Sequence, residues 1–98
     1  MAKLTEKSVY GTSFHGTTIT TTLQKLIDAL GEPQFGDNSG QDKSNFDFIC
    51  ETEDGDVFTI YDWKEYRPLK MNEIVTFHIG GSSKFVTMTA KTELANIL

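Results

Sequence analysis

The sequence of 98 residues predicts one α+β domain, 1–98, in which a mainly antiparallel sheet carries two helices packed on one face. Two kinds of periodicity support this fold class. In several stretches apolar residues alternate with polar ones, as they do in half-buried strands. In two other stretches apolar residues recur every three or four positions, as they do on one face of a helix. The predicted order is β-α-β-β-β-α.

The first half of the chain predicts a strand, a helix and a long loop. Weak alternation places the strand at 8–14. A helix follows, because threonines can cap its start, Gly31 can end it, and its apolar residues fall at i, i+3, i+4 and i+7: Leu23, Leu26, Ile27 and Leu30. The segment after this helix is rich in Gly, Pro, Asp, Asn and Ser, which indicates a loop.

The second half predicts a β-hairpin, a further strand and a second helix. Asp54-Gly55 is a strong hairpin turn between two alternating stretches. The next strand, in "EIVTFHIGG", is expected to end at Gly80-Gly81. The C-terminal helix is expected to begin between Ser82 and Thr89, because apolar residues then recur at helical spacing.

Composition excludes several classes of function. The net charge of −5 argues against binding a nucleic-acid polymer, which relies on clustered Lys and Arg. No apolar run approaches the roughly 20 residues of a membrane span, and no secretory signal is visible, so we expect a cytoplasmic protein. The one cysteine, Cys50, is expected to be a buried thiol, and the two histidines are too far apart in sequence to indicate a metal site. We expect no metal and no cofactor.

Two Gly-rich turns are candidate anion sites. In each, a strand is expected to end in small residues that feed a helix, where free backbone N–H groups favour an anion. The first supplies Tyr10, Thr12, Ser13 and His15, and the second supplies His78, Gly80, Gly81 and Ser82. "GGSSK" lacks the spacing of a P-loop. The alternative is a plain turn with serine capping.

The stretch "VFTIYDWKEYRP" places aromatic and basic residues side by side. Trp63 or Tyr66 could stack on a nucleobase, and Lys64 and Arg67 could pair with phosphate. Equally, the rings could belong to the core or sheet surface while the cations stay solvated. No GxSxG motif surrounds a serine, and we expect no enzyme activity.

Four motifs, "YGTSF", "LGEP", "ETEDGDVFTIYDWKEYR" and "FHIGG", resemble a family of small phage-encoded proteins. The resemblance runs from Tyr10 to Leu94. It implies a phage anti-defence protein of the anti-CBASS sponge type, acting in the host cytoplasm. Such a protein binds a cyclic di- or trinucleotide messenger of the host without cleaving it. The resemblance also implies a homo-oligomer, with Asp42-Lys43 closing over the ligand.

Two other functions remain open at this point. Glu51, Glu53, Asp54 and Asp56 surround the hairpin turn, and such an acidic row could imitate DNA phosphates toward a host defence protein. The chain could also be a phage accessory or assembly protein with no small ligand.

Overall fold

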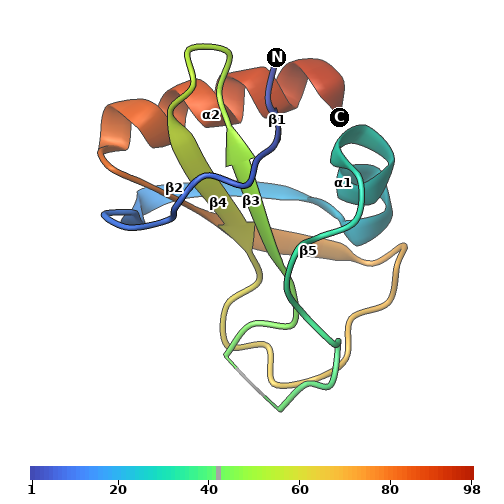
Figure 1. The fold of residues 1–98 in the computed structure, drawn as a ribbon. Helices are drawn as coiled ribbons and strands as arrows, with labels where there is room; N and C mark the ends of the chain where they lie inside the picture. Colours follow the sequence, from blue (N-terminus) through green and yellow to red (C-terminus); the bar gives the residue numbers. More distant parts are fainter. Residues whose placement is uncertain (42) are drawn as a thin grey trace.

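The computed structural model describes residues 1–41 and 43–98 and confirms the α+β class (Figure 1). Its elements are β1 (Lys3–Leu4), β2 (Ser13–Thr22), α1 (Leu23–Leu30), β3 (Asp47–Glu51), β4 (Val57–Tyr61), β5 (Ile74–Gly81) and α2 (Lys84–Ile97). The five strands form one antiparallel sheet in the order β1-β3-β4-β5-β2. The predicted hairpin is β3-β4, and both predicted helices are present.

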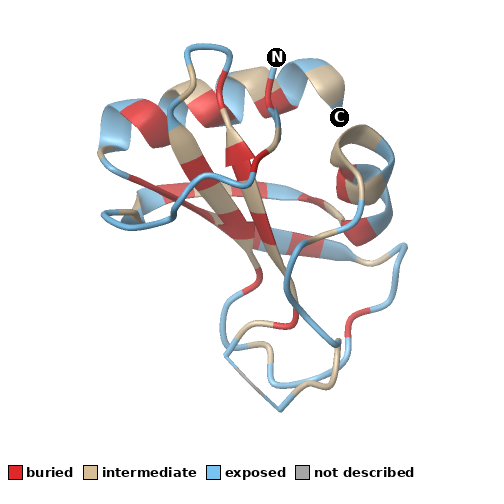
Figure 2. Cartoon of the chain, in the orientation of Figure 1, coloured by how far each residue is buried: buried red, intermediate tan, exposed pale blue. Residues whose placement is uncertain are grey.

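Both helices cover the same face of this sheet. Buried residues alternate with partly exposed ones along β3 and β4, so each of these strands turns one face toward the helices (Figure 2). The core on that side joins strand residues Phe48, Phe58, Ile60, Phe77 and Ile79 to helix residues Leu23, Leu26, Ala90 and Leu94. Each fully buried apolar side chain of this size contributes about 1.5–3 kcal/mol. On the opposite face of the sheet, called the open face below, the described residues form no helix.

Capping residues set where the helices begin. The Thr22 hydroxyl accepts a hydrogen bond from the Lys25 N–H at 3.2 Å, and the Ser83 hydroxyl accepts one from the Val86 N–H at 3.2 Å. The second helix therefore begins at Lys84, inside its predicted window. Its cap is Ser83, while the neighbouring Ser82 is exposed.

The first strand was predicted wrongly at 8–14. The segment 8–12 is mostly exposed, and β2 instead occupies Ser13–Thr22. Thr17, Ile19 and Thr21 are buried, so these β-branched residues form a strand by packing on the helix side. The short β1 was not predicted, because it exists only through its pairing with β3.

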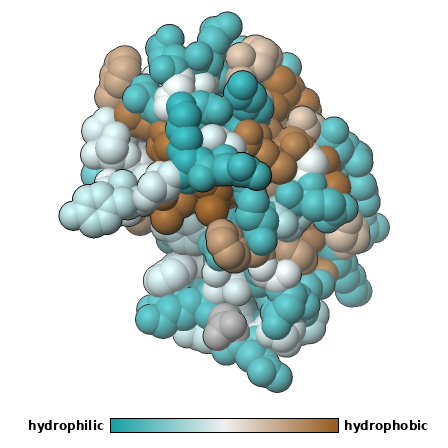
Figure 3. All heavy atoms as spheres, in the orientation of Figure 1, coloured by the Kyte–Doolittle hydropathy of each residue, from teal (hydrophilic) through white to brown (hydrophobic). Residues whose placement is uncertain are grey.

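The hydropathy of the surface differs between the sheet and helices on one hand and the loops on the other (Figure 3). In Figure 3 hydrophobic residues gather over the sheet and helices, and the loops at the bottom of the view are mostly hydrophilic. Cys50 is a fully buried free thiol, as predicted, and burial raises its pKa to about 12. Among the described residues no helix has the length and apolar character needed to cross a bilayer.

Candidate functional site

Strand register decides which side chains meet on the open face. One row across the sheet contains Asp47, Tyr61, His78 and Thr18, and the next contains Ile49, Thr59, Gly80 and Phe14. Gly80 lies in this second row between Thr59 and Phe14 and contributes no side chain to it. A Cβ atom there would lie 2.6 Å from Thr59 Oγ1 and 3.6 Å from Tyr61 Cε1. Glycine at this position lets its neighbours close together over the backbone.

Four rings gather at this place: Phe14, Tyr61, Trp63 and His78, called the aromatic face below. Phe14 stacks on His78 with ring centroids 4.0 Å apart and an interplanar angle of 13°. The Trp63 and His78 ring centroids are 6.0 Å apart, with an interplanar angle of 25°. The Tyr61 ring meets the Trp63 and His78 rings edge-on. Trp63 is 40% exposed and Phe14 is 43% exposed, so both offer ring surface to a ligand.

A β-bulge brings Phe14 into this cluster. Phe14 pairs with Gly80 and Thr18 pairs with His78, so residues 15–17 lie opposite Ile79 alone. Gly16, with φ of 90°, occupies the bulge. Bulges bend a strand and redirect its side chains, and they are frequent beside functional sites. Here the bend lets Phe14 reach diagonally onto the His78 ring.

Two lysines lie over the Trp63 ring. Lys43 Nζ is 5.8 Å from the ring centroid and Lys64 Nζ is 5.6 Å from it, within the range of cation–π contact. Lys64 holds a left-handed conformation with φ of 55°, and Tyr66 does the same at 51°. Such conformations cost roughly 1–3 kcal/mol each and tend to cluster at binding sites. The Lys64 N–H donates to the Lys43 carbonyl at 2.6 Å, which joins the two loops that carry these lysines.

The buried carboxylate of Asp62 holds together the two loops that carry Lys43 and Lys64. Asp62 is fully buried, and its Oδ1 accepts hydrogen bonds from the backbone N–H groups of Asn45 at 2.8 Å and Phe46 at 3.0 Å. Its Oδ2 accepts a third from Asn45 Nδ2 at 3.0 Å. Asn45 Nδ2 also donates to the Arg67 carbonyl. Asp62 thus positions both the turn after β4 and the segment that presents Lys43.

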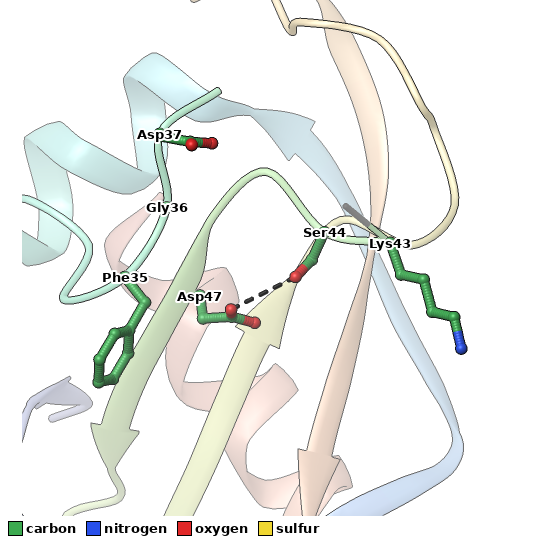
Figure 4. Close-up of a pocket in the computed structure, with 6 residues that line it drawn as sticks. All are labelled: Phe35, Gly36, Asp37, Lys43, Ser44 and Asp47. Atoms are coloured by element: carbon green, nitrogen blue, oxygen red, sulfur yellow. Dashed lines mark hydrogen bonds between the residues drawn. The ribbon is translucent and has the colours of Figure 1, made fainter. Parts of the chain in front are cut away.

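A cavity of about 680 Å³ lies beside the aromatic face, lined by Phe35, Gly36, Asp37, Lys43, Ser44 and Asp47 (Figure 4). We call it the loop pocket. Ser44 Oγ donates to Asp47 Oδ2 at 3.3 Å, and the Lys43 side chain extends away from Asp47. Burial raises the Asp47 pKa, an effect that Ser44 partly offsets. Asp47 pairs with Tyr61 across the sheet and Lys43 lies over Trp63, so the loop pocket adjoins the aromatic face.

Burial also sets the charge state of the aromatic face. It lowers the His78 pKa below 6.5, so this ring is neutral at neutral pH. It raises the pKa of Tyr61, which stays a neutral phenol, and Asp47 adds to that shift. The positive charge next to Trp63 therefore comes from the lysines.

The first predicted anion turn is wrong as a strand-to-helix junction, because α1 begins only after the ten residues of β2. Tyr10 is 96% exposed on a turn, and the Thr12 hydroxyl donates to the Val9 carbonyl at 2.7 Å. Ser13 and His15 lie at the bulged end of β2, where His15 Nε2 is 3.0 Å from the Gly81 carbonyl oxygen. This turn therefore lacks the helix N-terminus that was expected to bind an anion.

The second predicted turn is confirmed as a strand-to-helix junction, because β5 ends at Gly81 and α2 begins at Lys84. Gly80 and Gly81 are buried, however, and pair with β4 on one side and β2 on the other. Backbone groups flanked by two ladders are poorly placed to bind phosphate. Of this predicted group, His78 belongs to the aromatic face and Gly80 forms its floor.

Arg67 is engaged elsewhere. Its guanidinium makes a bidentate pair with Glu73, with both N–O distances 2.8 Å, and lies 3.6 Å from Glu65. Tyr66 is exposed. The predicted phosphate contact by Arg67 would require the Glu73 pair to break, so Lys64 and Lys43 are the better candidates.

We expect the Glu73 carboxyl to titrate near 2, because Arg67 and then the Lys70 N–H lower its pKa to about 2. The folded-state pKa lies below the ordinary value of 4.5, so the pair stabilises the fold above that value and loses its effect as pH falls toward 2. Carboxyl ¹³C NMR should show this midpoint, and Arg67→Gln should move it upward. An unchanged midpoint in Arg67→Gln would contradict the pairing, and Lys25→Gln serves as the control.

The sequence pattern did not identify Phe14, Tyr61 or Asp62 as residues of the site. Phe14 looks isolated in the sequence, and only the bulge and the β2-β5 pairing place it on His78. Asp62 sits on the buried side of the alternation, which is the one signal that could have revealed it. Asp42, expected beside Lys43, lies outside the described residues.

No family model, curated protein or solved structure matches the chain. Within 1–41 and 43–98, no three His, Cys, Asp or Glu side chains are grouped to hold a metal ion. The aromatic face, its two lysines and the adjoining loop pocket are thus the features from which a function can be argued.

Proposed function

We propose that this chain binds a cyclic di- or trinucleotide on the aromatic face and sequesters it without cleaving it. The observation that carries the proposal is the exposed Trp63 ring beneath Lys43 and Lys64. Aromatic rings stack on any base, and ammonium groups pair with phosphate. This is the activity expected of a phage protein that removes a host immune signal, as the sequence resemblance implies.

Local charge favours an anion even though the whole chain is acidic. The net charge is −5, yet both charged side chains over Trp63 are lysines. A local positive potential attracts phosphate independently of the sign of the total charge. Exposed charges are screened over about 8–10 Å at physiological salt, so affinity should fall as salt is added.

The loop pocket supplies groups of the opposite kind. Asp47 and Ser44 offer acceptor oxygens next to Tyr61, and the amino groups of nucleobases are donors. A base stacked on Trp63 would place its phosphates near the lysines and direct its edge toward these acceptors. The arrangement therefore separates base recognition from phosphate binding.

A second copy of the chain would complete such a site. The aromatic face lies on an open sheet, which can cover only one side of a ligand, whereas binding sites usually bury about 70–90% of a small ligand. A symmetric partner could cover the other side. We therefore keep the homo-oligomer as part of the proposal.

The ion pairs around the hairpin argue against the alternative function, in which a row of acids imitates DNA phosphates toward a host defence protein. Glu51 lies 2.6 Å from Lys7 Nζ and 3.9 Å from Lys3 Nζ, and Glu53 lies 3.8 Å from the N-terminal amine. These cations interrupt the row of acids that would imitate DNA phosphates. No observation favours this function over nucleotide binding.

A thermal-shift screen tests the proposal. We expect one cyclic di- or trinucleotide of adenine or guanine to raise the melting temperature, because a ligand that binds only the folded state at 100 times its Kd adds about 2.7 kcal/mol. For a domain of this size that is roughly 10 °C or more. Chromatography of the released ligand should recover it intact.

The controls are the matching linear nucleotides, which should give much smaller shifts. Flat melting curves across the whole panel would overturn nucleotide binding. Cleaved ligand would overturn sequestration and indicate an enzyme.

A further inference from the structure

The longest edge of the sheet is β2, which pairs with β5 on one side and, in the part of the chain that the structure describes, has no strand on the other. It runs for ten residues, far longer than the other edge strand, β1. Its outward backbone groups make no hydrogen bond with another element among the described residues. A long edge of unpaired N–H and C=O groups is a template for a further strand.

Beyond the bulge at residues 15–17, the edge lacks the usual protection against strand addition. Between Thr17 and Thr22 the sequence is "TTITTT", with no proline and no charge inside the strand. β-branched residues of this kind favour extended pairing. Proline, inward-pointing charge, short length and bulges are the devices that block it. The bulge of β2 precedes this segment, and the segment itself contains none of these devices.

A groove runs beside this edge, between the strand and the two helices. Its volume is about 420 Å³, and its walls are Thr18, Ile19, Thr20 and Thr21 of β2, Lys25 of α1, and Lys91, Ala95 and Leu98 at the end of α2. The charged side chains of this lining are both lysines. Neither Lys25 nor Lys91 forms an ion pair with any described residue.

We propose that β2 accepts an extended acidic peptide of a partner protein as an additional strand, with Lys25 and Lys91 pairing with its carboxylates. In this mode main-chain hydrogen bonds supply affinity, and flanking side chains select the sequence. A strand added to the edge would place alternate side chains over the groove. Acidic residues at those positions match the two lysines.

A second copy of the chain fits this edge less well than an acidic peptide. Two-fold pairing of β2 with itself would bring Lys25 and Lys91 of both copies to the same seam. Like charges brought close together across an interface are destabilising. Charge complementarity therefore selects the acidic peptide.

Fluorescence anisotropy tests the proposal with a fluorescein-labelled, acetylated eight-residue peptide in which Thr and Glu alternate. We expect saturable binding that weakens about tenfold or more in the K25E/K91E variant. The K3E/K7E variant makes the same change in net charge beside β1 and β3, at the opposite end of the sheet from β2, and should bind almost normally. Amide exchange measured by NMR should slow in β2 when the peptide is present.

Several results would overturn the proposal. These are equal binding of a peptide with Lys in place of Glu, unchanged binding of a peptide with alternate backbone nitrogens methylated, or unaltered exchange in β2. Protection of β2 that rises with protein concentration in the absence of peptide would assign the edge to a second copy instead. Trp63→Ala should leave peptide binding unchanged, which separates this site from the aromatic face.

Discussion

Asp62→Ala should lower the free energy of unfolding by about 3 kcal/mol or more. The substitution removes a fully buried carboxylate and leaves three N–H donors, from Asn45 and Phe46, without their acceptor. Each unsatisfied buried donor costs about 1–3 kcal/mol. A domain of this size has a total stability of only about 5–15 kcal/mol, so the loss should be obvious in urea unfolding followed by circular dichroism.

A matched control separates this effect from the loss of a negative charge. Asp56 is an exposed acid at the hairpin turn, and Asp56→Ala should change stability by no more than about 0.5 kcal/mol. Asp62→Asn keeps the shape but replaces one acceptor oxygen with a donor, so it should fall between the two. Stability of Asp62→Ala within 1 kcal/mol of wild type would mean that the loops do not depend on this carboxylate.

The same variant links the fold to the proposed site. Asp62 holds Asn45 and Phe46, and the neighbouring Lys43 carbonyl accepts the Lys64 N–H. Loosening this clamp should let both lysines move away from Trp63. Any nucleotide that binds wild type should therefore bind folded Asp62→Ala more weakly.

Trp63→Ala should reduce affinity for the cyclic nucleotide that gives the largest thermal shift. Stacking of a base on an aromatic ring contributes about 1–3 kcal/mol, which is roughly a 5- to 150-fold change in Kd. Trp63 is partly exposed and lies beyond the end of β4, so the variant should fold normally. Isothermal titration calorimetry measures the change, and Trp63→Phe should retain most of the affinity.

Phe85→Ala is the matched control for this loss of a ring. Phe85 is 78% exposed and belongs to α2, which packs on the face of the sheet opposite the aromatic face. Its removal should leave Kd unchanged. Equal binding by Trp63→Ala and wild type would place the ligand elsewhere on the molecule, and an equal loss in Phe85→Ala would point to a non-specific effect.

Local patterns were sufficient for most of the elements. The β3-β4 hairpin followed from two-residue alternation around Asp54-Gly55, and both helices followed from apolar spacing and hydroxyl caps. These signals act within a few residues, because they depend on which face of one element is apolar. The strand at 8–14 failed because its alternation was weak, while the burial that forms β2 depends on helices distant in sequence.

In the aromatic face, too, some residues could be recognised from local sequence and others only from long-range contacts. Trp63, Lys64 and His78 were recognisable from the sequence by residue type, but nothing local joins them to Phe14 or Lys43. A bulge in β2, a glycine in β5 and the Asp62 clamp bring these groups together. Each of those devices acts between segments far apart in the chain.

Local sequence patterns were enough to predict the fold class, the extent of the first helix and the hairpin, because propensity, capping and periodicity act over a few residues. Tertiary contacts alone establish that Arg67 pairs with Glu73, that Gly80 and Gly81 are hydrogen-bonded to strands on both sides, and that β2 is an edge of the sheet. Those outcomes depend on strand order and on long-range pairing, in which each residue's partner is chosen by the packing of the whole sheet.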